Sequence, residues 1–336
     1  MKKSEKCKEL KIREPLFSSY HFQGVATATI LENPTIENWF LNNAVILTCE
    51  RKFLDGFSTP DLRIKNSAIF ECPCFDTTYI SSRFIEKEYM KIIKNCIDRG
   101  FFVGYSNIDD FYIEGKTFYK KRHFPHDGLI IGYNDSDKTF TIFAYDSSWK
   151  YRSFKTPQSG FEKGRKSALK DNKYSNFCVF KPKCDIFEFS AKTSLLNIRE
   201  YLNSSISLYP KTKRGIVSGI AVHKYIIMYL NKLIDNSIPY HKSDWRIMRI
   251  IWEHKKVMLK RIEMIQAELG LKTGYSEAYS KALRLADKAR ILYASYETKQ
   301  RNDLLLKIIS LLKEIDKIEK NVLKRLIRKA EKNEII

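Results

Sequence analysis

The segment His126-Asp127-Gly128-Leu129-Ile130-Ile131-Gly132-Tyr133, with the polar residues 134–137 and the apolar run 139–145 that ends at Asp146, decides the fold of this chain. Both apolar runs are typical of strands, and the residues between them are typical of a turn. If the runs pair antiparallel about residue 136, His126 and Asp146 become cross-strand neighbours. A carboxylate there can orient an imidazole and stabilise its charged form. The hairpin therefore predicts the base and the orienting acid of a nucleophilic enzyme.

Length and composition exclude several classes of protein. The 336 residues are 43% hydrophobic, enough for two domains with sizeable cores. No run of about 18 apolar residues occurs, and residues 1–13 lack the apolar stretch of a signal peptide, so we expect a cytoplasmic protein without a membrane partner. The seven cysteines show no disulfide-like rhythm. Cys72-Pro73-Cys74 is too tightly spaced for a zinc pair, so we expect no metal.

The net charge of +21 is concentrated in one half of the chain. Residues 1–150 contain 21 Lys/Arg and 20 Asp/Glu, whereas the remainder contains 39 and 19. Such asymmetry indicates an acidic partner for the second half, whether nucleic acid, an anionic membrane surface or a protein. Aromatic residues do not alternate with Lys and Arg in a recognisable binding motif, so we do not expect nucleic acid to be that partner.

Periodicity predicts a mixed first half and a helical second half. The expected strands are 44–48, 101–105 and 176–180, the expected helices are 23–31, 84–98, 194–202, 216–234, 243–270, 275–296 and 302–333, and 157–173 is expected to be a loop. Asp109 and Asp110 are expected to be loop residues, and His254, among lysines, a surface residue. We expect two domains, 1–185 and 186–336.

Three segments of the first half resemble a known family. They are Tyr20–Ile30, then 100–105 with Asp109-Asp110-Phe111-Tyr112, and lastly His126–Tyr133 with Asp146. Together they are similar to the papain-like fold of peptidase C39-type proteins, and most similar to the branch recruited to antibiotic biosynthesis, which includes the butirosin acyltransferase group and the amide-forming homologue of closthioamide assembly. The resemblance covers residues 15–182. It implies an α+β fold, with a papain-like domain (a helix packed on an antiparallel sheet) followed by a basic helical region.

The nucleophile of that family is absent from the position where the resemblance places it. The family's cysteine opens the first core helix, where the helix dipole lowers a thiol pKa. The aligned residue is Ala26, which cannot attack a thioester. Ala26 is either an engineered Cys-to-Ala replacement or the mark of a natural pseudoenzyme. We favour the engineered replacement because His126 and Asp146 persist. Cys49, at the end of a strand, is a weaker candidate nucleophile.

The resemblance also implies a mechanism. A thiolate at position 26 would attack an acyl thioester, and His126, oriented by Asp146, would move the protons. The backbone N–H of residue 26 and one further donor would hold the oxyanion, and Gln23, Tyr20 and His21 remain alternatives for that donor. The acyl group would arrive on the phosphopantetheine of an acidic acyl or peptidyl carrier protein. It would then pass to a small amine acceptor, with no other cofactor.

The sequence therefore favours an amide-forming acyltransferase of thiotemplated antibiotic biosynthesis. A C39-like cysteine peptidase and a catalytically dead binding homologue are the alternatives. Neither the acyl donor nor the amine can be identified from the residues.

Overall fold

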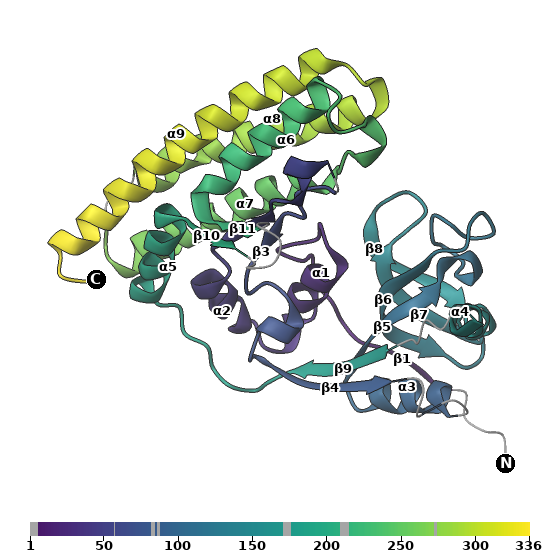
Figure 1. Ribbon diagram of the computed structural model, residues 1–336. Coiled ribbons are helices and arrows are strands. Elements are labelled where there is room, and N and C mark those ends of the chain that lie inside the picture. Colours follow the sequence, from purple (N-terminus) through teal and green to yellow (C-terminus); the bar gives the residue numbers. More distant parts are fainter. Residues whose placement is uncertain are drawn as a thin grey trace. The chain divides into compact units, whose positions relative to one another are not determined.

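The computed structural model describes residues 6–56, 58–81, 85, 88–170, 176–208, 215–271 and 274–336, and it is a mixed α+β structure (Figure 1). The chain divides into two compact units. Unit 1 contains residues 1–34 and 68–185, and unit 2 contains residues 35–67 and 186–336. The predicted boundary after residue 185 coincides with a change of unit, but the stretch 35–67, which was predicted to lie in the first domain, belongs to unit 2. The physical reason is strand pairing, because this stretch supplies two strands to the sheet of unit 2.

Unit 1 is built on an antiparallel sheet with strand order β4-β9-β5-β6-β7-β8, to which β1 adds by pairing with β6. The strands are β1 (Cys7–Glu9), β4 (Phe75–Ser81), β5 (Phe102–Asp109), β6 (Pro125–Asn134), β7 (Thr139–Tyr145), β8 (Tyr151–Pro157) and β9 (Asn176–Pro182). The strands predicted at 101–105 and 176–180 are therefore confirmed as parts of β5 and β9.

The predicted hairpin is β6 with β7. Leu129 pairs with Phe143 and Ile130 with Ile142, which is the register expected from a turn centred at residue 136. A bulge follows Ile130, and beyond it the register shifts by one residue. The ladder ends at Leu129, three residues short of His126, so pairing does not extend to the two residues on which the sequence argument depends.

The described residues of unit 1 also form the α-helices α1 (His21–Ala28), α3 (Tyr89–Asp98) and α4 (Gln158–Lys170). The helix predicted at 84–98 is confirmed from Tyr89 onward, and residues 84, 86 and 87 lie outside the described residues.

The loop predicted at 157–173 is wrong over residues 158–170, which form α4, and residues 171–173 lie outside the described residues. Its glycines, taken as loop formers, allow close helix packing instead. A Cβ at Gly160 would lie 2.5 Å from the carbonyl oxygen of Tyr112, and one at Gly164 would lie 2.9 Å from Ile108. Tertiary contact with β5 has therefore overridden the low helix propensity of the segment.

Unit 2 combines long helices with a small antiparallel sheet of order β10-β11-β2-β3. Its helices are α2 (Ile36–Asn43), α5 (Ala191–Asn203), α6 (Val222–Ile234), α7 (Arg246–Glu268), α8 (Tyr275–Lys299) and α9 (Asn302–Lys332), and its strands are β2 (Leu47–Glu50), β3 (Arg63–Ile64), β10 (Ser205–Leu208) and β11 (Gly215–Ser218). The helices predicted at 194–202, 243–270, 275–296 and 302–333 are confirmed. The helix predicted at 216–234 begins only at Val222, because its first residues form β11.

The apolar stripe of α9 forms a core with α8 and α6, as its spacing predicted. Leu305, Ile308, Leu312 and Ile315 are all buried, while the lysines between them face outward. Within the described part of the chain, every helix is too short or too polar to cross a membrane.

Candidate active site

The first core helix begins at His21, five residues before the position assigned to the nucleophile. Tyr20 has the extended backbone of an N-cap residue, and His21 is the first residue of α1. Ala26 lies in the middle of the helix, is fully buried and does not line the adjacent pocket. The assignment of Ala26 to the helix start is therefore wrong, and the residue that opens the helix is His21.

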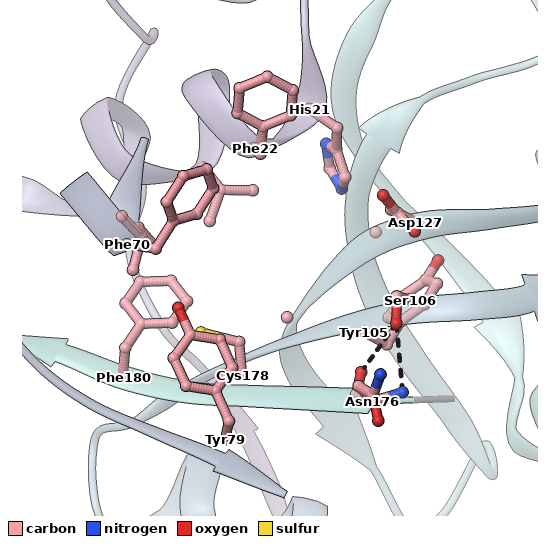
Figure 2. Close-up of a pocket in the computed structure, with 14 residues that line it drawn as sticks. His21, Phe22, Phe70, Tyr79, Tyr105, Ser106, Asp127, Asn176, Cys178 and Phe180 are labelled. Carbon is pink, nitrogen blue, oxygen red and sulfur yellow. Dashed lines mark hydrogen bonds between the residues drawn. The ribbon is translucent and has the colours of Figure 1, made fainter. Parts of the chain in front are cut away.

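A pocket of about 180 Å³ lies in unit 1 beside this helix start (Figure 2). It is lined by His21, Phe22, Val25, Ile69, Phe70, Tyr79, Gly104, Tyr105, Ser106, Asp127, Gly128, Asn176, Cys178 and Phe180. A cavity of about 150 Å³ holds benzene, so this pocket has room for a group of roughly that size.

The pocket has an aromatic side and a polar side (Figure 2). Phe22, Phe70, Tyr79 and Phe180 gather on one side, and His21 and Asp127 lie on the other. Phe70 and Tyr79 are 65% and 60% exposed, which is unusual for large aromatic side chains. Apolar walls with a few convergent polar groups are the usual composition of a small-molecule site.

Tyr151 on β8 positions the imidazole of His21. The hydroxyl of Tyr151 lies 2.7 Å from Nδ1 of His21 and donates to its backbone carbonyl at 3.3 Å. The hydroxyl has a single proton, so it either donates to that carbonyl and accepts from Nδ1–H, or donates to Nδ1. The first arrangement leaves the lone pair of the ring on Nε2. Nε2 is buried and makes no hydrogen bond of acceptable geometry with the described residues.

The surroundings of His21 favour its neutral form. Burial lowers the pKa of the imidazole well below its usual value, and the positive charge of Lys116 and the nearby His126 lower it further. The backbone carbonyl of Gly128 acts in the opposite direction and raises the pKa. At neutral pH the ring is therefore a free base, and Gly128 stabilises the ring once it gains a proton.

His126 pairs with a different acid from the one predicted. Its Nδ1 lies 3.8 Å from Oδ2 of Asp110, which begins the short helix η5 (Asp110–Tyr112). Burial raises the pKa of the Asp110 carboxyl to about 6, although Lys116 acts against this. Asp109 and Asp110, expected to be loop residues, are buried where β5 passes into η5.

Asp146 is buried near the end of the hairpin but does not orient His126. Its carboxylate accepts hydrogen bonds from the backbone N–H groups of Ser148 and Lys150, at 2.8 and 2.9 Å, and from the Arg152 guanidinium. Burial alone would raise the Asp146 pKa, but these donors hold it below its usual value. The predicted His126–Asp146 pair is thus corrected. The tight turn after β7 supplies nearer donors than the imidazole, and the carboxylate closes that turn instead.

A buried lysine that was not among the predicted site residues lies beside this site. Nζ of Lys116 donates to the backbone carbonyl of Asp127 at 3.2 Å and lies 3.6 Å from Oδ1 of Asp110. Burial lowers the Lys116 pKa, and Asp110 raises it again. No pattern around residue 116 reveals this role, because burial of a single lysine depends on tertiary structure.

Of the three predicted oxyanion donors, only His21 lines the pocket. Gln23 is fully buried inside α1, and the ring of Tyr20 stacks on Phe22. Cys178 does line the pocket, but burial raises the pKa of its thiol to about 11, so it is protonated at neutral pH. Cys49, the weaker candidate nucleophile, is a buried thiol of unit 2, and burial raises its pKa to about 12.

No protein-family model matches the chain, and no curated protein matches it closely enough to count as a relative.

The packing of β8 on α1 can be tested with a double-mutant cycle. A Cβ at Gly24 would lie 2.7 Å from the ring of Tyr151, so we expect Gly24→Ala to lower the free energy of unfolding by about 1–3 kcal/mol. In a Tyr151→Ala background the ring is gone, and the same change should be neutral or stabilising by about 1 kcal/mol, because alanine favours a helix. Denaturant unfolding of the four proteins measures the coupling. Equal costs in both backgrounds would contradict the contact.

Proposed function

We propose that unit 1 is an acyltransferase of papain-like ancestry in which His21 acts as a general base and no acyl-enzyme forms. It would transfer an acyl group from the thioester of a carrier protein to a small amine, giving an amide. The observation that carries the proposal is Nε2 of His21, a buried nitrogen of a neutral imidazole that makes no hydrogen bond with the described residues and lies at the wall of a pocket of suitable size. Perturbed titratable groups of this kind are concentrated at functional sites.

The steps follow from these groups. The neutral amine nitrogen attacks the thioester carbonyl carbon, and Nε2 of His21 accepts a proton from that nitrogen. The imidazolium gains the Gly128 carbonyl as a hydrogen-bond acceptor. The positive end of the α1 dipole, at His21, would stabilise the developing oxyanion. The carbon–sulfur bond then breaks, and the leaving thiolate takes the proton from His21. The base is restored, and one amide and one thiol are formed.

The substrates proposed above agree with the chemistry of the residues. The aromatic side of the pocket suits an aromatic or short acyl group, and the carboxylate of Asp127 offers a counter-ion for an ammonium group of the acceptor. Residues 35–67 and 186–336 contain 34 Lys/Arg and 20 Asp/Glu, so unit 2 attracts an acidic carrier protein and the phosphate of its arm. A thiol peptidase is less favoured, because the one pocket thiol among the described residues, Cys178, is protonated.

The test compares His21→Gln with His126→Gln, which removes the base that the sequence predicted. A benzoyl-pantetheine thioester with 1,3-diaminopropane is the probe, and mass spectrometry measures the amide. We expect His21→Gln to lower kcat/KM by about 100-fold, in the range typical of a lost general base, and His126→Gln by much less.

Three outcomes oppose the proposal. A covalent acyl adduct on the wild-type protein would show a nucleophilic mechanism instead. A larger loss of kcat/KM in His126→Gln than in His21→Gln would show that His126 is the general base. If the wild type binds the thioester but forms no amide with it, or with thioesters loaded on carrier proteins, the chain is a binding homologue.

A further inference from the structure

Unit 2 contains a groove that the proposed acyl transfer does not use. It has a volume of about 640 Å³ and is lined by Leu202, Ser204, Ile220, Ala221, His223, Lys224, Ile227, Met228, Lys313, Asp316 and Lys320. These residues come from α5, α6, α9 and the turns between α5 and α6, and α6 packs directly against α9 (Figure 1). The groove is thus bounded by rigid elements of one unit.

The lining combines apolar side chains with three lysines. Leu202, Ile220, Ile227 and Met228 supply the apolar surface. Lys224 and Lys313 form no ion pair with any residue that the structure describes, whereas Lys320 pairs with Asp316 at 2.7 Å. With one carboxylate against three ammonium groups, the groove carries an excess of two positive charges.

One wall of the groove is a buried histidine. His223 is 1% exposed, its Nδ1 lies 3.5 Å from Oδ1 of Asp316, and the geometry of that contact falls short of a hydrogen bond. Its Nε2 lies 3.1 Å from Nζ of Lys255, which is fully buried and pairs with Glu319 at 2.8 Å. His223 thus links the carboxylate of Asp316 at the groove to the buried Lys255–Glu319 pair behind it.

We propose that this groove binds an amphipathic phosphate monoester, with the phosphate between Lys224 and Lys313 and the attached chain on the apolar lining. Lysine binds phosphate as a point charge, and two ammonium groups without a carboxylate partner cost little to rearrange around it. The chain of the ligand supplies the second part of the affinity by covering apolar surface. The inference stands on unit 2 alone and does not depend on the proposed chemistry of unit 1.

The experiment uses octyl phosphate as the probe and the full chain. Isothermal titration should show that the wild type binds octyl phosphate. Methyl phosphate and octanol should each bind at least about 30-fold more weakly, because each lacks one half of the ligand. A Lys224→Gln/Lys313→Gln variant should bind octyl phosphate about tenfold more weakly. The matched control is Lys324→Gln/Lys329→Gln, which removes the same charge from exposed positions of α9 outside the groove, and it should change the affinity by less than about twofold.

Two further arms identify the source of the ligand. Phosphopantetheine and a lysophosphatidic acid carry the same phosphate on different chains. The one that the wild type binds more tightly indicates the chemical class of the natural ligand. Equal losses in the groove variant and the control variant would show general attraction to a basic protein and overturn the site. The site would also be overturned if the Kd of the wild type for octyl phosphate exceeded about 1 mM, a binding free energy near 4 kcal/mol.

Discussion

Glu319→Gln is expected to lower the free energy of unfolding by about 3–5 kcal/mol, because it removes one partner of a buried ion pair and leaves the other charge uncompensated. Glu319 and Lys255 are both fully buried, and their charged atoms lie 2.8 Å apart. Tyr201 donates to one carboxylate oxygen at 3.0 Å, and Tyr279 donates to the other. Loss of the negative charge therefore disturbs three donors at once.

The histidines around Lys255 cannot replace the lost charge. His254, expected to be a surface residue, is 1% exposed, and its Nε2–H donates to the carbonyl of Val45 at 2.7 Å. Its Nδ1 then accepts from Lys255 at 3.2 Å. Burial lowers the His254 pKa well below its usual value, and Lys255 lowers it further, so the ring stays neutral. Glu319 is thus the carboxylate on which the buried ammonium depends.

The stability difference should depend on pH in a defined direction. Burial by itself raises the Glu319 pKa, but Lys255 and His223 outweigh it and hold the folded value below the usual one. A group with a depressed folded pKa contributes stability above its unfolded pKa, about 4.3, and loses that contribution as the pH falls through the folded pKa. The difference between wild type and Glu319→Gln should therefore be full at pH 7 and shrink in acid.

Denaturant unfolding at pH 7 and pH 3.5 provides the measurement. Glu314→Gln is the matched control, since Glu314 lies on the same helix and forms an exposed pair with Lys281 at 2.6 Å. Exposed pairs contribute about 0–1 kcal/mol, so the control should change little at either pH. A Glu319→Gln protein as stable as the control would show that the cluster does not carry a buried charge.

The second large effect concerns the start of α1. A cysteine placed at position 21 would lie at a helix N-terminus beside the pocket, where the dipole lowers a thiol pKa. A cysteine at position 26 would be enclosed by packed side chains and would react only when the helix opens. We therefore expect iodoacetamide to alkylate His21→Cys on the order of 1,000-fold faster than Ala26→Cys at neutral pH.

Mass spectrometry of each variant over time gives the two rates, and mutation of the wild-type Cys7 and Cys184, both exposed, removes background labelling. If the engineered thiol at 26 reacts as fast as the one at 21, the helix start assigned here is wrong. Formation of a stable acyl adduct by His21→Cys with a thioester would add support for thiol-enzyme ancestry, because it would restore the step that the wild type lacks.

Much of the fold could be predicted from local patterns. The hairpin register about residue 136, the long helices of unit 2 and their apolar stripes all follow from short-range periodicity. Segments whose structure depends on distant partners could not be predicted. The glycines of α4 resemble a loop until β5 is placed against them, and residues 35–67 show no sign that their partner strand lies more than 150 residues further along the chain.

The candidate site likewise could be predicted only in part. His21 was recognised as a residue near the helix start, but the apolar run after residue 23 moved the predicted start of the helix two residues along the chain. The family resemblance, rather than the periodicity, placed Ala26 at the opening of that helix. The register correctly brought His126 and Asp146 to the same end of the hairpin. It could not show that the turn at 146–150 supplies closer donors for Asp146, nor that Asp110 would be buried beside His126.

The division of the chain between the two units has a consequence for its synthesis. The backbone passes from one unit to the other three times, after residues 34, 67 and 185. Strand β2 leaves the ribosome long before its neighbour β11, so an apolar strand edge must wait through the translation of strands β4 to β9 of unit 1. No single cut can release either unit intact. A fragment ending at residue 185 would expose β2 without its neighbour and should aggregate, whereas a piece that omits residues 35–67 and joins 34 to 68 is the logical way to produce unit 1 by itself.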